Sequence, residues 1–113
     1  MSKFSPQTVE AQVDLAGRSV FAEKTYAVPA GAGNYTVKGA PGRVVNAVVT
    51  AAGTATDNAI IYDNSQGAAS GTILAEILGG TAVGTQITIQ MPAGQGITVV
   101  NVASGPGFTL GYS

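Results

Sequence analysis

The 113-residue sequence predicts an all-β fold, either an antiparallel β-sandwich or a closed, jelly-roll-like β-barrel, with an extended N-terminal arm. Sixteen glycines and five prolines divide the chain into short pieces. These pieces are rich in Val, Ile, Thr and Tyr, and several alternate apolar with polar residues, as half-buried strands do. Between them there is no amphipathic segment of about 10–15 residues, which a parallel α/β fold requires. Short strands separated by regular turns are typical of sandwiches and barrels.

Nine segments are predicted to form strands. Residues 86–90, Gln-Ile-Thr-Ile-Gln, show the cleanest alternation, whereas residues 96–102 are more continuously apolar, as expected of a strand covered on both faces. Residues 72–78 also suit a short helix by composition, but the segment is short and ends at Gly79-Gly80, which favours a strand. In chain order the predicted strands are residues 11–15, 19–28, 33–38, 43–50, 59–63, 72–77, 85–90, 96–102 and 108–112.

Turn sequences lie where these strands end. Pro29-Ala30-Gly31 and Pro92-Ala93-Gly94 each place a proline of fixed φ before a glycine that tolerates positive φ. Residues 40–42, 63–67 and 104–107 combine Gly, Pro, Asn, Asp and Ser in the same way. The turns therefore support the strand boundaries.

The chain is predicted to contain one β-domain, residues 18–113, preceded by an arm, residues 1–17. The arm has no tight-turn pair, and it is too short to bury its own apolar side chains. It is either an extended arm that packs on a partner or a frayed terminus with one short edge strand. The apolar residues predicted to bind a partner are Phe4, Val9, Val13 and Leu15.

The low charge predicts association. Only 10% of the residues are charged, against roughly 25% in typical soluble domains. A weakly charged surface is poorly protected against association, so we expect a homo-oligomer or docking on a larger assembly. All five basic residues lie within the first 43 positions, which indicates either two faces of different potential or a chance distribution among eleven charges.

Nucleic acid and membrane are not predicted as partners. The net charge of -1 lacks the basic excess of a nucleic-acid-binding domain. No apolar run approaches the roughly 18 residues of a membrane span. The N-terminal residues also lack the apolar core of a signal peptide.

The residue types argue against an enzyme. Without His and Cys, the commonest general base, the usual zinc ligands and the strongest nucleophile are all missing. Gly31-Ala32-Gly33 leads into a strand-like segment and lacks the later glycine of a phosphate-binding loop, so we interpret it as a β-turn. No catalytic residue, cofactor site or metal site is predicted.

Two further features have a structural and a functional interpretation. Asp57-Asn58 and Asp63-Asn64-Ser65 carry oxygen ligands of the kind calcium uses, but the spacing is not that of an EF-hand and such residues usually form turns. The seven aromatic residues are scattered along the strands, which favours packing over a carbohydrate- or protein-binding cluster.

Residues 42–54, Gly-Arg-Val-Val-Asn-Ala-Val-Val-Thr-Ala-Ala-Gly-Thr, are followed at residues 58–63 by Asn-Ala-Ile-Ile-Tyr-Asp. This resembles a pattern in small virion proteins of tailed bacteriophages: a hydrophobic strand, an Ala/Gly/Thr turn and an Ile-Tyr-Asp strand. Residues 71–74, 92–100 and 107–112 fit the same layout. Residues 1–39 have no counterpart in the resemblance.

Such virion proteins include head decoration, or capsid cement, proteins, which lie on the outer capsid surface, often as trimers. The resemblance implies a non-enzymatic structural protein, a homotrimer located on the outer capsid surface of the virion, with the major capsid protein as its partner and the arm as its anchor. No catalytic residues come with this family. The alternative is a fibre, tail or adhesin-type β-module that recognises glycan or protein through grouped, exposed tyrosines. An enzyme using Asp57 and Asp63 is the third and weakest hypothesis.

Overall fold

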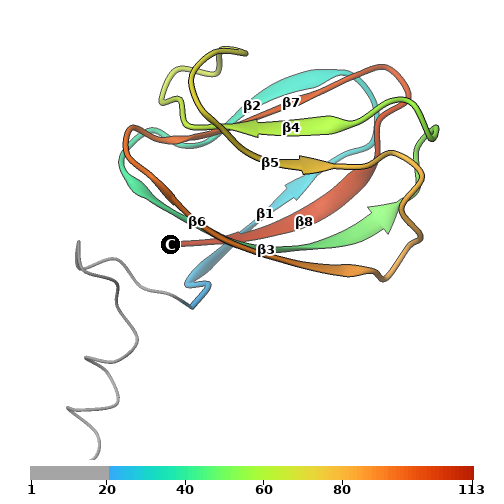
Figure 1. Cartoon of the computed structure of the whole chain (residues 1–113), viewed down its shortest axis with the longest axis horizontal. Coiled ribbons are helices and arrows are strands. Elements are labelled where there is room, and N and C mark those ends of the chain that lie inside the picture. The colour runs from blue at the N-terminus through green and yellow to red at the C-terminus, as the bar shows by residue number, and fades with distance from the viewer. Residues whose placement is uncertain (1–20) are drawn as a thin grey trace, which may run out of the picture.

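The computed structural model describes residues 21–113, which form two four-stranded antiparallel sheets packed face to face (Figure 1). The predicted all-β sandwich is confirmed, as two separate sheets instead of a closed barrel. Residues 21–113 include no helix, and therefore none long and apolar enough to cross a membrane. The strands are β1 (Lys24–Val28), β2 (Gly33–Lys38), β3 (Gly42–Ala51), β4 (Ala59–Tyr62), β5 (Ile73–Ile77), β6 (Gln86–Ala93), β7 (Ile97–Asn101) and β8 (Gly107–Tyr112).

The chain crosses repeatedly between the sheets. The first sheet has the order β1-β8-β3-β6 and the second has the order β2-β7-β4-β5, so only β4 and β5 are consecutive strands of one sheet. The edges β5 and β6 lie on one lateral side of the sandwich, where they contact each other. On the other side lie β1 and β2, joined by the tilted ring contact of Tyr26 and Tyr35, 6.2 Å between centroids. The connecting loops gather at the two ends.

The core lies between the sheets and is built from the alternating inward residues of both. Central strands β3, β7 and β8 are the most thoroughly buried, as their apolar runs predict. Removing this apolar surface from water supplies the main driving force for folding. The largest fully buried apolar side chains are Phe108, Ile61, Ile77, Ile97, Leu110, Val28, Val44, Val49 and Val99.

The predicted strand positions are largely confirmed. Six of them agree with β2, β3, β4, β5, β7 and β8 to within one residue at each end, and the ambiguous segment at 72–78 is a strand. Segment 19–28 is shorter than predicted, because β1 begins only at Lys24 and the preceding residues 21–23 are all exposed. Segment 11–15 lies outside the described residues.

One predicted turn is wrong. Residues 92–94 were expected to form the turn, but β6 continues through Pro92 to Ala93, with Pro92 opposite Arg43. An edge strand tolerates proline, since the missing N–H costs nothing on the side without a partner strand. By contrast, the predicted turn at residues 29–31 is confirmed, and Gly31 there adopts a φ of 102°.

Candidate functional site

The four residues predicted to bind a partner lie outside the described residues, so their role stays a prediction. The same holds for the predicted arm, residues 1–17, as a whole. The described chain begins at Phe21, just before β1, and the predicted β-domain accounts for all of it. The predicted partner-binding residues are Phe4, Val9, Val13 and Leu15.

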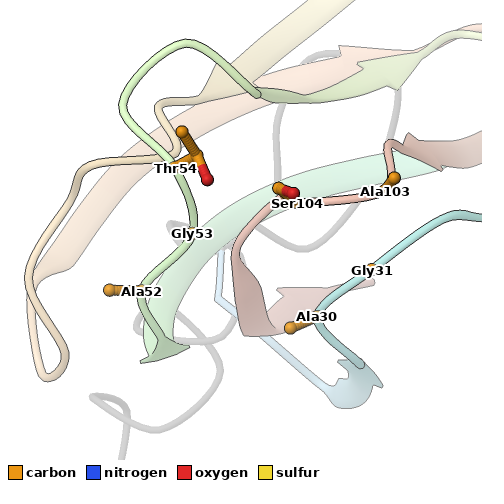
Figure 2. Close-up of a pocket in the computed structure, with 8 residues that line it drawn as sticks. Ala30, Gly31, Ala52, Gly53, Thr54, Ala103 and Ser104 are labelled. Carbon is orange, nitrogen blue, oxygen red and sulfur yellow. The ribbon is translucent and has the colours of Figure 1, made fainter.

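An open pocket of about 460 Å³ lies at one end of the sandwich (Figure 2). Three loops form it: the β1–β2 turn, the β3–β4 loop and the β7–β8 turn. The Asn101 side chain connects two of these loops, since its Nδ2 donates to the Pro29 carbonyl (3.2 Å) and the Pro106 carbonyl (2.8 Å). The lining residues are Ala30, Gly31, Ala52, Gly53, Thr54, Ala103, Ser104 and Gly105.

Close backbone packing explains the small residues around this pocket. A Cβ on Gly53 would stand 2.4 Å from the Ser104 carbonyl oxygen, and the Thr54 N–H donates to that same oxygen at 2.8 Å. The lining carries two hydroxyls, those of Thr54 and Ser104, and no titratable side chain. The pocket is therefore a consequence of loop packing and has no groups for acid–base chemistry.

The Asp63 carboxylate is committed to holding a turn. Its Oδ1 accepts the N–H groups of Gln95 (2.8 Å) and Gly96 (3.2 Å), and its Oδ2 accepts the N–H of Gly94 (3.0 Å). The backbone N–H of Asp63 donates to the Thr72 carbonyl at 2.7 Å. One residue thus joins the β6–β7 turn to the β4–β5 hairpin across the two sheets.

Asn58 and Asn64, which were also weighed as calcium ligands, bind groups of the loops. Asn64 Oδ1 accepts the N–H of Gln66 at 2.7 Å, an Asx turn, and Asn58 Oδ1 accepts the N–H of Gly79 at 2.9 Å. Asn58 Nδ2 donates to Glu76 Oε1 at 2.9 Å. Among residues 21–113 no group of three or more His, Cys, Asp or Glu side chains is placed to hold a metal ion. The turn-forming interpretation fits these contacts.

An apolar rim runs along the side of the sandwich where β5 and β6 lie. Its four side chains are well exposed for large apolar residues, from 38% for Met91 to 64% for Val83. Ile73 is at the start of β5, and Leu78 and Val83 lie in the β5–β6 connection. Ile87 and Ile89, the apolar face of β6, are only partly buried behind the rim. We define the apolar rim as Ile73, Leu78, Val83 and Met91.

The tyrosines do not form an exposed cluster. All four lie in the described part of the chain, and each is buried or half-buried. Tyr26 and Tyr35 contact each other across the sheets, and Tyr112 is 9% exposed. The packing interpretation of these side chains is therefore supported.

Comparison of the chain with protein-family models, with curated proteins and with solved structures found no match. The apolar rim was not predictable from the sequence, because no local pattern distinguishes its two strand residues and two loop residues from apolar residues that become buried. Sequence reasoning noted Asp63 and Asn58 but not their partners, which lie 18 to 33 residues away along the chain. Asn101 went unnoticed altogether, since a lone Asn at a strand end has no distinguishing pattern.

Proposed function

We propose that the chain is a structural virion protein that decorates and stabilises the outer surface of a bacteriophage capsid by binding the major capsid protein. The observation that carries the proposal is the apolar rim, which holds four of the six large apolar residues that are exposed among residues 21–113. Exposed apolar residues gathered on one side of a small domain are typical of an interaction surface. Ile73, Leu78 and Val83 are each more than half exposed, although the core beside them is fully buried.

The polar side chains support an architectural role. Asp63, Asn58 and Asn101 bind backbone groups of neighbouring loops and so make the ends of the sandwich rigid. A rigid domain loses little conformational freedom on docking, which favours binding by shape and apolar contact. The sparse surface charge imposes little repulsion between copies held side by side on a shell.

A capsid also multiplies weak contacts. Each copy needs only modest affinity when many identical sites act together on a symmetric particle, and linked sites raise the overall affinity further. In this proposal the chain is a homotrimer on the virion surface, and the predicted arm attaches it to the major capsid protein. Its anchors would be Phe4, Val9, Val13 and Leu15.

The test is add-back to capsids. Particles of the phage that encodes the chain are prepared with its coding sequence deleted, incubated with purified protein, separated from free protein and analysed by quantitative mass spectrometry. We expect the full-length chain to bind at a fixed ratio to the major capsid protein. A variant lacking residues 1–17 is expected to stay folded and to lose capsid occupancy. Full-length protein that leaves the shells bare would overturn the proposal, and equal occupancy by the truncated variant would overturn the role of the arm.

The alternative, a glycan-binding fibre, tail or adhesin-type module, relies on grouped and exposed tyrosines. The four tyrosines instead pack against the sandwich. The loop-end pocket offers two hydroxyls and no aromatic platform for a sugar ring. The apolar rim is thus the better-supported interaction surface, and it suits a protein partner.

A further inference from the structure

The outer faces of the two sheets differ in composition. On the first sheet, residues directly opposite each other on neighbouring strands form the outward-facing row Thr25–Gly111–Asn46–Thr88, across β1, β8, β3 and β6. This row contains two hydroxyls, one amide and one glycine, as expected of a face that stays in water. The first sheet therefore shows how a solvated sheet surface of this protein is composed.

The corresponding row of the second sheet is apolar at its centre. It runs Asn34–Val100–Ile60–Glu76 across β2, β7, β4 and β5, which lie side by side (Figure 1). The residue before Val100 and the residue after Ile60 belong to the core, so the row faces outward. Val100 and Ile60 are half-buried on the two central strands, whereas the two polar members are exposed on the edge strands.

The apolar surface continues beyond this row. Tyr62 lies two residues after Ile60 on the same side of β4, and Ile73 of β5 stands opposite Tyr62. Ile73 is 52% exposed and belongs to the apolar rim. The outer face of the second sheet is thus continuous with the rim, and it is the more apolar of the two outer faces.

The polar groups at the margins of the row keep hydrogen-bonding capacity. Glu76 Oε1 accepts a hydrogen bond from Asn58 Nδ2 at 2.9 Å. Asn34 Nδ2 donates to the Gly67 carbonyl of the β4–β5 loop at 3.2 Å. A carboxylate has two oxygens and an amide nitrogen has two N–H groups, so both side chains are held in place and each has a further group for a partner.

We propose that the outer face of the second sheet binds the same face of a second copy of this chain, around a two-fold axis parallel to the strands. Such an axis reverses the strand order, so β2 of one copy lies over β5 of the other, and β7 lies over β4. The row is complementary to itself in this arrangement. Val100 stands over Ile60 of the second copy, and the Asn34 amide stands over the Glu76 carboxylate, to which it donates.

The twist of the sheets is compatible with these contacts. Stacked sheets cross at about 30°, and the outer strands lie about 7 Å from the axis, so the crossing shifts them by roughly 4 Å. The side chains of Asn34 and Glu76 span that shift. The central pair lies close to the axis and is shifted less, so Val100 and Ile60 stay in contact.

The β4–β5 loop gives the face a matching step. It folds over β7, where the Gly67 N–H donates to Thr98 Oγ1 at 3.2 Å and Thr98 Oγ1 donates to the Asn64 carbonyl at 2.8 Å. The loop raises the β2–β7 half of the face near one end. The two-fold axis places this raised half over Tyr62 and Ile73 of the second copy, so the two copies fit together without collision.

Sedimentation equilibrium of the full-length chain tests the contact between about 10 μM and about 1 mM, where small interfaces associate. Ile60→Lys places a charge at the centre of the contact and is expected to weaken association at least about tenfold. Val48→Lys is the matched control, since Val48 is a half-buried valine facing outward on a central strand of the first sheet, and it should leave association unchanged. Circular dichroism checks that both variants fold. Wild-type protein that stays monomeric at about 1 mM, or equal association of the two variants, would overturn the contact.

Asn34 and Glu76 give a sharper test, because both are exposed and substitution there spares the core. In one chain they lie on opposite edges, three strand spacings or about 14 Å apart, so they do not meet. Asn34→Asp sets carboxylates against each other at both ends of the contact and should weaken association at least about tenfold. Adding Glu76→Gln restores a donor and should return association to within about threefold of wild type.

This rescue acts only between copies, since Glu76→Gln leaves the lost contact of Asn34 with Gly67 unrepaired. Undiminished association of Asn34→Asp, or no rescue by the second substitution, would overturn the two-fold arrangement. The contact is compatible with the proposed trimer as a link between trimers. The experiments use the free protein without capsids, so their failure leaves capsid binding untouched, and bare capsids would leave the two-fold contact untouched.

Discussion

Replacing Asp63 by alanine is expected to lower the free energy of unfolding by about 3 kcal/mol. A hydrogen bond to a charged group contributes about 1.5–3 kcal/mol when it is shielded from water, and we take about 1 kcal/mol for each of the three partly solvated hydrogen bonds that Asp63 accepts. The Asp63 carboxylate accepts three backbone N–H groups, from Gly94, Gln95 and Gly96, at 2.8 to 3.2 Å. The alanine variant leaves all three donors without this acceptor. The β6–β7 turn then loses its connection to the β4–β5 hairpin.

Urea unfolding followed by circular dichroism measures this change. For a domain of this size the urea dependence is about 1–1.5 kcal/mol per molar, so the midpoint should fall by roughly 2–3 M. Asp63→Asn should lose only about 1 kcal/mol, because its one carbonyl oxygen can still accept the two N–H groups that Oδ1 accepts, those of Gln95 and Gly96.

Asp57→Ala is the matched control, since it also removes an aspartate carboxylate, but one that precedes β4 instead of following it. We expect that control to change stability by less than about 0.5 kcal/mol, as is usual at surface positions. Equal losses for Asp57→Ala and Asp63→Ala would refute the reasoning, because the effect would then follow from charge alone and not from the three amides.

Three further substitutions probe other contacts, each by the same urea titration. Asn101→Ala should cost about 2–4 kcal/mol, since its buried amide joins two loop carbonyls that would lose their donor; a loss under 1 kcal/mol would contradict that role. Gly53→Ala should destabilise the protein more than Gly84→Ala. The new Cβ at position 53 would stand 2.4 Å from a backbone oxygen, whereas at position 84 it would meet nothing within 4 Å and only the φ of 88° is unfavourable. The reverse order of stabilities would refute the close-packing argument. Phe108→Ala should cost about 3–5 kcal/mol, since the side chain is fully buried between the sheets, and a smaller loss would mean that the core refills the cavity.

Local chemistry made much of the fold predictable. Alternation of apolar and polar residues depends only on the two-residue repeat of a strand, so segments such as 33–38 and 86–90 could be recognised from nearest neighbours alone. Gly31 was predictable for the same kind of reason, because a proline two residues earlier and a required positive φ define its turn. Pro92 misled the prediction, since whether proline ends a strand depends on whether that strand lies at an edge.

The candidate surfaces were not predictable in this way. Ile73 and Leu78 look like ordinary apolar residues in the sequence, and the folded structure leaves them 52% and 57% exposed at and beside β5, the last strand of its sheet. Asp63 looks like a turn residue, and its three partners lie more than thirty residues further along the chain. Contacts at that separation depend on which strands become neighbours.

By itself, then, the sequence determined most of the local structure of residues 21–113, that is the strands and most of the turns, and it determined the low content of charge. Those properties follow from the conformational preferences and polarity of residues close together in the chain. Only the tertiary structure decided the sheet order, and with it which strands are edges, which apolar residues remain exposed and which carboxylate holds a distant turn. The physical reason is that strand pairing is a competition among segments far apart in the chain, and its outcome depends on the burial of the whole core.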